Sequence, residues 1–524
     1  MQDRKSFVRS FYGENHPIAG DYDRSLAVNC VNGTFVGKMT DGVIEFKGIP
    51  FVGEQPSGKN RFKAPVPYES DDGVYEAYYY APSPPQTENF SEEASYYYQS
   101  EDCLYLNVWK NTSDESAGKP VMVWIHGGAF EAGGTADPIY HGFNFAKANP
   151  DVVLVTITYR LGALGFIHLS HLPDGADYPD AQNLGMLDQQ MALRWVYENI
   201  AVFGGDPENI TVFGESAGAG SVTLLPLMPE AKRYIRRVIA QSGTVGFTRS
   251  TQEAIACTTE ILSFLGCGTV AELCEKSAEE LADADDQIAL RVFPERDGSL
   301  IPSDPYEAYA RGDAKDIQLL QGCNKDEHGY FIMEIGGPEP FTDYFAERIE
   351  EKLALLPPED AKKLRDYYDN CAEQPYMRVA HTFDQLYFNA PAFHLSENQA
   401  AGGGKVWNYY FTVESSIPYV RSGHAVELAP VLNNLDNTTV TGRPFDNTFC
   451  RVLQRMWVQF AKTGDPSLSA AESPDGKEHT WSPYTPESRN IMVLDEYDIH
   501  PSTEKELHIL DWERIYPLTK YYTF

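Results

Sequence analysis

The chain has 524 residues, of which 42% are hydrophobic, so it is long enough to bury a large core. Its 76 acidic residues outnumber 42 basic ones and give a formal net charge of −34, which excludes nucleic acid as an expected partner because phosphates would be repelled. No apolar run reaches the roughly 18 residues of a membrane-spanning helix, so no membrane partner is expected either.

The first third of the chain predicts short strands and turns. Residues 74–98 hold two tyrosine triplets around a proline-rich turn, which predicts a long, partly buried surface loop. Two apolar runs follow, at 121–125 and 152–157. Short, continuous apolar runs of this kind are typical of parallel strands buried on both faces. The core of a sheet is therefore expected to begin here.

Beyond these runs, strand and helix patterns alternate along the chain. Between residues 183 and 202, apolar residues recur at intervals of three and four, which predicts an amphipathic helix. Such alternation indicates a mostly parallel α/β sheet, and no repeat or flexible linker interrupts it, so residues 1–524 are predicted to form one elaborated domain. Further strands are predicted at 210–213, 238–241, 317–322 and 405–413, and further helices at 252–264, 276–290, 341–370 and 445–463.

The strand predicted at 210–213 runs directly into the segment GESAG at 214–218. A G-x-S-x-G segment between a strand and a helix is the pattern of a nucleophile elbow, in which a tight turn strains the serine and exposes its Oγ. A side chain at Gly214 or Gly218 would collide across that turn. A helix is predicted after it, from Val222 to near Pro229. The small residues could instead mark a helix start that merely packs closely. The pattern favours Ser216 as a nucleophile.

A second glycine segment lies after the strand predicted at 121–125. Its residues are His126, Gly127 and Gly128, and adjacent glycines leave backbone N–H groups bare enough to approach a substrate oxygen. Together with the amide of Ala217, they would supply three donors for an oxyanion. An ordinary glycine turn is the alternative.

A serine nucleophile also needs a base and an acid that orients the base. Asp326 and Glu327 both follow the strand predicted at 317–322 and are both candidates for the acid. His424 lies in a loop after a late strand, where this chain order places the base. His328 is too close to the acids in sequence to be oriented by them easily. The other histidines after the acids are His381, His394, His479, His500 and His508.

Motifs spread over nearly the whole chain resemble the type-B carboxylesterases, a family of the α/β-hydrolase superfamily that includes the cholinesterases, and in particular its bacterial-type members. The resemblance implies a central, mostly parallel sheet flanked by helices, with large insertions around an active-site gorge. The motifs are GIPF (48–51), RF (61–62), SEDCLYLNVW (100–109), TYRLGALGF (158–166), NLGMLDQQMALRWV (183–196), IAQSG (239–243), DGSLIP (297–302) and FAKTGDP (460–466).

The same resemblance assigns roles to individual residues. It implies Glu327 rather than Asp326 as the acid, beside Ser216 as nucleophile and His424 as base. The remaining implied residues are the oxyanion donors Gly127, Gly128 and Ala217, the neighbours of the triad Glu215 and Ser242, and two bracing ion pairs, Arg61 with Glu101 and Arg160 with Asp188.

The expected activity is hydrolysis of carboxylic esters through a Ser-His-Glu triad and an acyl-enzyme, without a metal or cofactor. Hydrolysis of an amide or lactone by the same triad is one alternative, and a non-catalytic binding protein of the same fold is another. The expected partner is a small-molecule ester with an apolar or aromatic group, because the tyrosine-rich loop and Phe247 could line the gorge. The sequence predicts no oligomeric state.

The cysteines and the N-terminus predict a cytoplasmic location. The first twenty residues lack the apolar core of a secretory signal, although secretion is the alternative if a leader has been trimmed. Cys103 fits a family cysteine that is normally paired, but no cysteine lies between 31 and 102. Cys267 and Cys274 resemble a second family pair, and on one continuous helix they would lie roughly 10 Å apart, too far to bridge.

Overall fold

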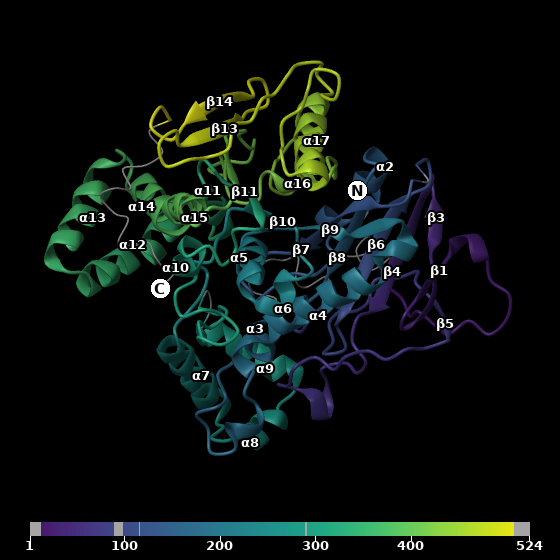
Figure 1. Cartoon of the computed structure of the whole chain (residues 1–524). Helices are drawn as coiled ribbons and strands as arrows, with labels where there is room; N and C mark the ends of the chain where they lie inside the picture. Colours follow the sequence, from purple (N-terminus) through teal and green to yellow (C-terminus); the bar gives the residue numbers. More distant parts are fainter. Residues whose placement is uncertain (1–11, 88–97, 115, 289–290, 508–524) are drawn as a thin grey trace. The chain divides into compact units, whose positions relative to one another are not determined.

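A computed structural model describes residues 12–87, 98–114, 116–288 and 291–507 of the chain (Figure 1). The chain divides into two compact units. The first comprises Met1–Ser221, Met228–Arg237 and Arg249–Ser303, and the second comprises Val222–Leu227, Val238–Thr248 and Asp304–Phe524. The single domain expected over residues 1–524 stays a prediction.

The first unit contains a sheet in the order β3-β4-β6-β8-β7-β9 and a separate small sheet in the order β1-β2-β5. β7 runs parallel to both of its neighbours, β8 and β9. The other neighbouring pairs, β3 with β4, β4 with β6 and β6 with β8, are antiparallel. The strands are β1 (Ala27–Cys30), β2 (Gly33–Val36), β3 (Lys38–Thr40), β4 (Val43–Pro50), β5 (Val74–Glu76), β6 (Tyr105–Asn111), β7 (Lys119–Ile125), β8 (Val153–Ile157) and β9 (Gly205–Glu215).

β7 lies at the centre of the parallel part, as its apolar sequence predicts. Its residues 121–125 are completely buried, because both faces of the strand are covered by protein. Trp124 is paired in register with Phe213 of β9, and their rings meet edge to face at 4.9 Å. This packing holds the carboxyl ends of β7 and β9 side by side, so the segments that follow these two strands emerge together.

The helices of the first unit follow the predicted pattern with shifted bounds. α4 has the expected apolar face, with Leu184 and Trp195 fully buried. α9 covers only part of the helix predicted at 276–290. The helices are α2 (Phe143–Ala148), α3 (Gly162–Gly165), α4 (Leu184–Asn199), α5 (Ala217–Leu224, whose last three residues belong to the second unit), α6 (Pro229–Lys232), α7 (Thr251–Leu265), α8 (Val270–Cys274) and α9 (Ala278–Asp285).

The tyrosine-rich segment is more ordered than the predicted loop. It begins with β5, which pairs with β2 in the small sheet, and Ser83 forms an isolated bridge with Gln99. Pro84, Pro85 and Gln86 are buried. The strand β5 was not predicted, whereas residues 77–87 form an irregular, partly buried segment, as expected. Tyr96 and Tyr97 of the second triplet lie outside the described residues.

The second unit contains strands in the order β10-β11-β12-β13-β14. β12 runs parallel to β11 and β13. β14 pairs antiparallel with β13, and both are drawn in yellow and labelled in Figure 1. β12 is buried along its whole length. The strands are β10 (Arg237–Gln241, whose first residue belongs to the first unit), β11 (Gln318–Asn324), β12 (Val406–Phe411), β13 (Asn490–Leu494) and β14 (His500–Thr503).

Helices carry most of the remaining chain in the second unit. The segment predicted as one helix at 341–370 is two, because Leu356 takes the extended conformation that is favoured before Pro357. Asp384–Asn389 form a π-helix, η10, which continues directly from α14 into α15. The α-helices are α10 (Pro305–Ala310), α11 (His328–Glu334), α12 (Pro338–Leu355), α13 (Pro358–Asn370), α14 (Pro375–Phe383), α15 (Ala390–Ala401), α16 (Leu428–Val431) and α17 (Asn447–Thr463).

All eight cysteines carry free thiols. Cys267 and Cys274 do not share a continuous helix, so the spacing expected on one helix does not apply to them. α7 ends at Leu265 and is capped by Gly266, whose left-handed φ of 67° suits a glycine, and Cys267 lies in the turn before α8. Within the described ranges, no helix combines the length and the apolar character needed to cross a membrane.

Candidate active site

Ser216 lies at the junction of β9 and α5, with a strained φ of 56°. A Cβ added at Gly218 would lie 2.1 Å from the carbonyl oxygen of Ile125, and one added at Gly214 would lie 2.6 Å from the same oxygen. Both glycines are therefore required by the end of β7. Ser216 is partly exposed while the residues on either side are buried. The helix begins at Ala217, earlier than the predicted start at Val222.

The glycine segment after β7 meets this elbow. A Cβ added at Gly127 would lie 3.1 Å from Ser216 Cβ and 2.9 Å from Glu215 Oε2, so only a glycine allows this approach. Gly128 is exposed and has a φ of 103°. Ala217 is the first residue of α5, where backbone N–H groups lack partners within the helix. The backbone of Gly127 and the first residue of α5 thus lie next to Ser216 in the first unit.

His126 orients the peptide between the two glycines. Its Nδ1 donates a hydrogen bond to the Gly127 carbonyl at 2.8 Å. A trans peptide points its C=O and N–H in opposite directions, so this bond also fixes the direction of the Gly128 N–H. Burial lowers the pKa of His126 to about 4, so the ring is neutral near pH 7. Tyr159 stacks on the ring at 4.6 Å and donates to the His126 carbonyl at 3.0 Å.

In the second unit, Glu327 accepts a hydrogen bond from His424 Nδ1 at 2.7 Å, and both side chains are buried. Ser242 Oγ and the Asn324 backbone N–H donate to the other oxygen of Glu327, at 2.6 and 2.7 Å. Burial raises the pKa of Glu327, and the bonds from His424, Ser242 and Asn324 oppose that rise. Asp326 lies 3.3 Å from the guanidinium of Arg421 instead.

The loop of His424 is fastened to the turn that carries Glu327. The His424 N–H donates to the Glu327 carbonyl at 2.9 Å. The Asn324 side-chain amide donates to the Gly423 carbonyl at 2.7 Å and to the Glu427 carboxylate at 2.6 Å. These bonds hold the imidazole of His424 beside the carboxylate of Glu327. Asn324 and Glu427 were not predicted, because no local pattern connects residues a hundred positions apart.

Aromatic rings cover the imidazole. Phe331 of α11 stacks against it with ring centroids 5.5 Å apart, and Phe388 of the π-helix lies at 5.0 Å. Phe247 meets Phe388 edge to face at 6.1 Å. With Nδ1 bound to Glu327, Nε2 is the ring nitrogen that can take part in proton transfer. A π-helix often marks a functional position, and this one brings Phe388 to His424.

The competing histidine and the two bracing ion pairs also have defined partners. His328 Nδ1 lies 2.7 Å from Asp384 in a buried pair, away from Glu327. Both ion pairs implied by the resemblance are present. Arg61 donates from Nε to Glu101 at 2.7 Å, and Arg160 donates from Nε to Asp188 at 2.8 Å in a buried, two-pronged pair.

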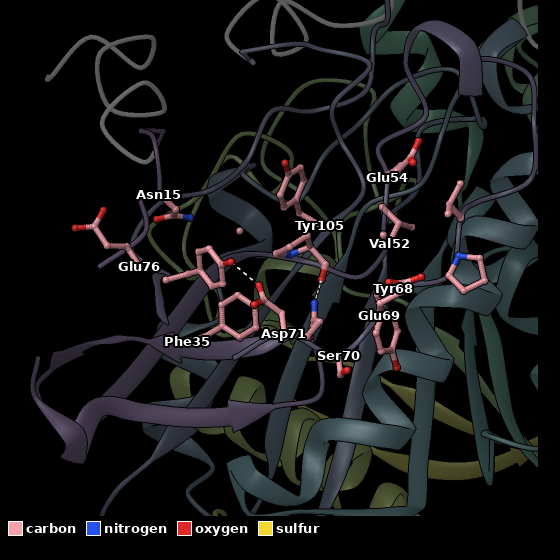
Figure 2. Close-up of a pocket in the computed structure, with 17 residues that line it drawn as sticks. Asn15, Phe35, Val52, Glu54, Tyr68, Glu69, Ser70, Asp71, Glu76 and Tyr105 are labelled. Carbon is pink, nitrogen blue, oxygen red and sulfur yellow. Dashed lines mark hydrogen bonds between the residues drawn. The ribbon is translucent and has the colours of Figure 1, made fainter. Parts of the chain in front are cut away.

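A hollow of about 600 Å³ lies elsewhere in the first unit (Figure 2). Aromatic and acidic side chains line it, and none of the predicted site residues does. Figure 2 shows Phe35 and Tyr105 among its walls, with Glu54, Glu69 and Asp71 around them. The hollow therefore does not belong to the constellation around Ser216.

The predicted site residues form two groups, one in each unit. The first unit brings together the nucleophile candidate and its donors, and the second brings together the acid and base candidates with Ser242. Their catalytic roles stay predictions. The residues that sequence reasoning missed are His126 as an orienting ring, Asn324, Glu427, Phe331 and Phe388. A histidine directly before paired glycines was the one signal that could have indicated its role.

Comparison with known proteins defines the class. A carboxylesterase of Geobacillus stearothermophilus, EST55, superposes with a TM-score of 0.80 at 35% identity, covering 94% of this chain and 100% of that one. A thermophilic pNB esterase gives a TM-score of 0.82 at 34% identity, covering 93% and 99%. The chain thus has the α/β-hydrolase fold, with a mostly parallel sheet flanked by helices.

The sequence comparisons narrow this class. The carboxylesterase family model matches residues 24–508. The para-nitrobenzyl esterase of Bacillus subtilis is 37% identical over 498 residues, which cover 90% of this chain and 96% of that protein. The chain belongs to the carboxylesterase family. It is a carboxylic-ester hydrolase that acts on small-molecule esters.

Proposed function

We propose that Ser216 is the nucleophile of this esterase, with His424 as its base and Glu327 as the acid that orients the base. His424 Nε2 takes the proton of Ser216 Oγ as that oxygen attacks the ester carbonyl. The tetrahedral intermediate then collapses, the alcohol leaves with a proton from His424, and the serine stays acylated. Water, activated by His424, hydrolyses the acyl-enzyme and frees the acid. Glu327 holds the imidazole tautomer and stabilises the imidazolium.

The negative oxygen of the tetrahedral intermediate is proposed to bind the amides of Gly127, Gly128 and Ala217. The close approach of Gly127 to Ser216 supports this assignment, because an oxygen bonded to the attacked carbon must lie within reach of both. These donors are fixed by the backbone, so they need no rearrangement when the charge develops. The reaction as proposed uses only groups of the chain itself.

The observation that carries the proposal is the buried bond between Glu327 and His424, in a chain whose serine stands on a strained elbow. Its test is Ser216→Ala, assayed with a p-nitrophenyl ester. We expect turnover to fall by about 10⁶, because triad members act as a unit. A fluorophosphonate probe should label the parent and spare the variant. Hydrolysis within tenfold of the parent, or labelling of the variant, would contradict the proposal.

The substrate is proposed to carry an apolar or aromatic group. Phe331 and Phe388 pack on the His424 ring and Phe247 packs on Phe388, and such rings favour bulky apolar groups over charged ones. A series of p-nitrophenyl esters of increasing acyl length, with benzoate as the aromatic member, tests this. We expect acetate to give a lower kcat/KM than longer or aromatic acyl groups. A matched anilide should be cleaved far more slowly than its ester, unless the amidase alternative is correct.

We further propose that the protein works in the reducing cytoplasm. Its eight free thiols support this location. Burial raises the pKa of Cys103 and Cys323, which keeps these two protonated and unreactive. Titration of the protein, denatured without reductant, should find all eight thiols. A stable disulfide in protein isolated under non-reducing conditions would contradict the proposal.

A further inference from the structure

Gln86 forms a two-pronged clamp on the segment that follows the paired glycines. Its Oε1 accepts from the Gly133 N–H, and its Nε2 donates to the Gly133 carbonyl, both at 2.8 Å. The same Nε2 donates to the Pro84 carbonyl at 3.0 Å, which fixes the orientation of the amide. The Gln86 side chain is only 5% exposed. The buried amide of Gln86 thus forms hydrogen bonds with both the backbone N–H and the backbone C=O of Gly133. A neighbouring β-strand would satisfy these two groups in the same way.

Gly133 lies directly over the hydrogen bond that orients the Gly127–Gly128 peptide. A Cβ added at Gly133 would lie 2.5 Å from His126 Nδ1 and 2.9 Å from the Gly127 carbonyl oxygen. The chain of contacts therefore runs from Gln86 to Gly133, and from Gly133 to the bond between His126 and Gly127. At its end stands the Gly128 N–H, one of the proposed oxyanion donors.

The loop between these glycines needs such support. Gly128, Ala129, Phe130 and Gly133 all have positive φ, at 103°, 56°, 63° and 112°. Positive φ is costly for residues with a Cβ, and it persists where surrounding contacts determine the backbone. The Ala132 N–H donates back to the Gly128 carbonyl at 2.8 Å, so the loop is folded on itself. Loss of the contacts to Gly133 would therefore release the C-terminal end of this loop.

We propose that Gln86 is a positioning residue for the oxyanion hole. Its clamp on Gly133 holds the Gly127–Gly128 peptide in the orientation that points the Gly128 N–H at the developing oxyanion. Gln86 itself does not touch substrate. The inference rests on the proposed function, because it gives Gln86 a role through donors assigned there. Its effect should therefore appear in the transition state and leave substrate binding almost unchanged.

The test compares Gln86→Met and Gln86→Glu with the parent. Methionine keeps the length of the side chain and removes its three hydrogen bonds, two to Gly133 and one to Pro84. Glutamate keeps an acceptor for the Gly133 N–H but turns an oxygen toward two carbonyls. The readouts are kcat and KM for a p-nitrophenyl ester, and the inhibition constant of an alkyl trifluoromethyl ketone. The ketone carbon accepts Ser216 Oγ and its oxygen becomes an oxyanion, so its affinity reports on the hole.

We expect both variants to lower kcat by about 10- to 100-fold, below the 10²–10³ typical of a deleted donor. The ketone inhibition constant should rise by the same factor while KM stays within twofold. Gln182→Met is the matched control. Gln182 is also buried in the first unit, and its Nε2 donates to the Pro179 carbonyl at 3.0 Å. That variant should lose comparable thermal stability and keep kcat and the inhibition constant.

Three results would overturn the inference. The Gln86 variants could keep both kcat and ketone affinity, or lose kcat while ketone affinity stays unchanged. They could also fail to fold while Gln182→Met folds, which would make Gln86 a structural residue alone. Ser216→Ala, assayed in parallel, separates the two proposals. If it remains active, the proposed function fails. If it is inactive and the Gln86 variants match the parent, only the role of Gln86 fails.

Discussion

Ser216 and its glycine loop depend on backbone geometry, whereas Glu327 and His424 depend on hydrogen bonds between buried side chains. At the elbow, Gly214 and Gly218 leave room for the carbonyl of Ile125. Around Glu327, the fixed quantities are bonds of 2.6 to 2.7 Å from three donors. The first arrangement is almost all-or-none, because a carbonyl and a Cβ cannot share one position. The second can lose one bond and retain the others.

This difference predicts how each region fails. A change at the elbow should act on folding and activity together, because the backbone itself must move. A change around Glu327 should act on activity more than on stability, because a polar side chain can be replaced by one of similar shape. Four substitutions, ordered by expected effect, test this contrast.

The largest effect is expected from Glu327→Gln, which keeps the shape and removes the charge. Ser242 and the Asn324 N–H would hold the amide oxygen, so the amide N–H would face His424 Nδ1 and favour the wrong tautomer. The neutral amide also cannot stabilise the imidazolium as a carboxylate does, so kcat should fall by about 10⁴. Asp326→Asn is the control, because Asp326 pairs with Arg421 and not with His424. Steady-state kinetics on one ester measures both. A larger loss in Asp326→Asn would reverse the assignment of the acid.

Next in size is Gly218→Ala in the elbow. The new Cβ would meet the Ile125 carbonyl oxygen at 2.1 Å, so the backbone must shift, and we expect about 3 kcal/mol of lost stability with a fall in turnover. Gly268→Ala is the control, because its nearest neighbour would be 3.7 Å away. Urea unfolding measures the change. A Gly218→Ala protein as stable as the parent would show that the elbow can relax.

A smaller effect is expected from Ser242→Ala, which removes one donor from Glu327. Glu327 keeps its bonds to His424 and to the Asn324 N–H, so kcat should fall only about tenfold. The control is Ser396→Ala, because Ser396 is equally buried and donates to Asn408 at 2.7 Å. Kinetics at pH 8 compares them. Equal kcat losses in the two variants would mean that Ser242 does not act through Glu327.

The smallest effect is expected from Glu334→Gln, read from a pH profile. The protein around the carboxyl of Glu334, an exposed residue of α11, raises its pKa to about 7, while Tyr330 and His424 oppose the rise. The carboxylate formed above that pH favours protonated His424. Its removal should therefore lower the pKa of His424 and move the acid limb of kcat/KM to lower pH, by a few tenths of a unit. A shift to higher pH would contradict this sign.

The same contrast explains what the sequence could predict. The elbow at 214–218 and the glycine segment at 126–128 could be predicted residue by residue. Each lies directly after a strand and tolerates few residue types. Glu327 and Asp326 could not be separated by position alone, and the family resemblance made that choice. Asn324, Glu427 and Phe388 act across long stretches of chain, and Gln86 lies in a segment predicted as a loop. Their roles depend on tertiary contacts that leave no local pattern.

The π-helix has a consequence for how this enzyme could diverge. Asp384–Asn389 form the π-helix, and Phe388 within it packs on the ring of His424. Successive residues of an α-helix are rotated by about 100°, so losing a single residue from this turn would swing the following side chains away together. Deletion of one codon there would therefore move Phe388 and the residues after it away from His424 in a single genetic step. The variant should then prefer a different acyl length.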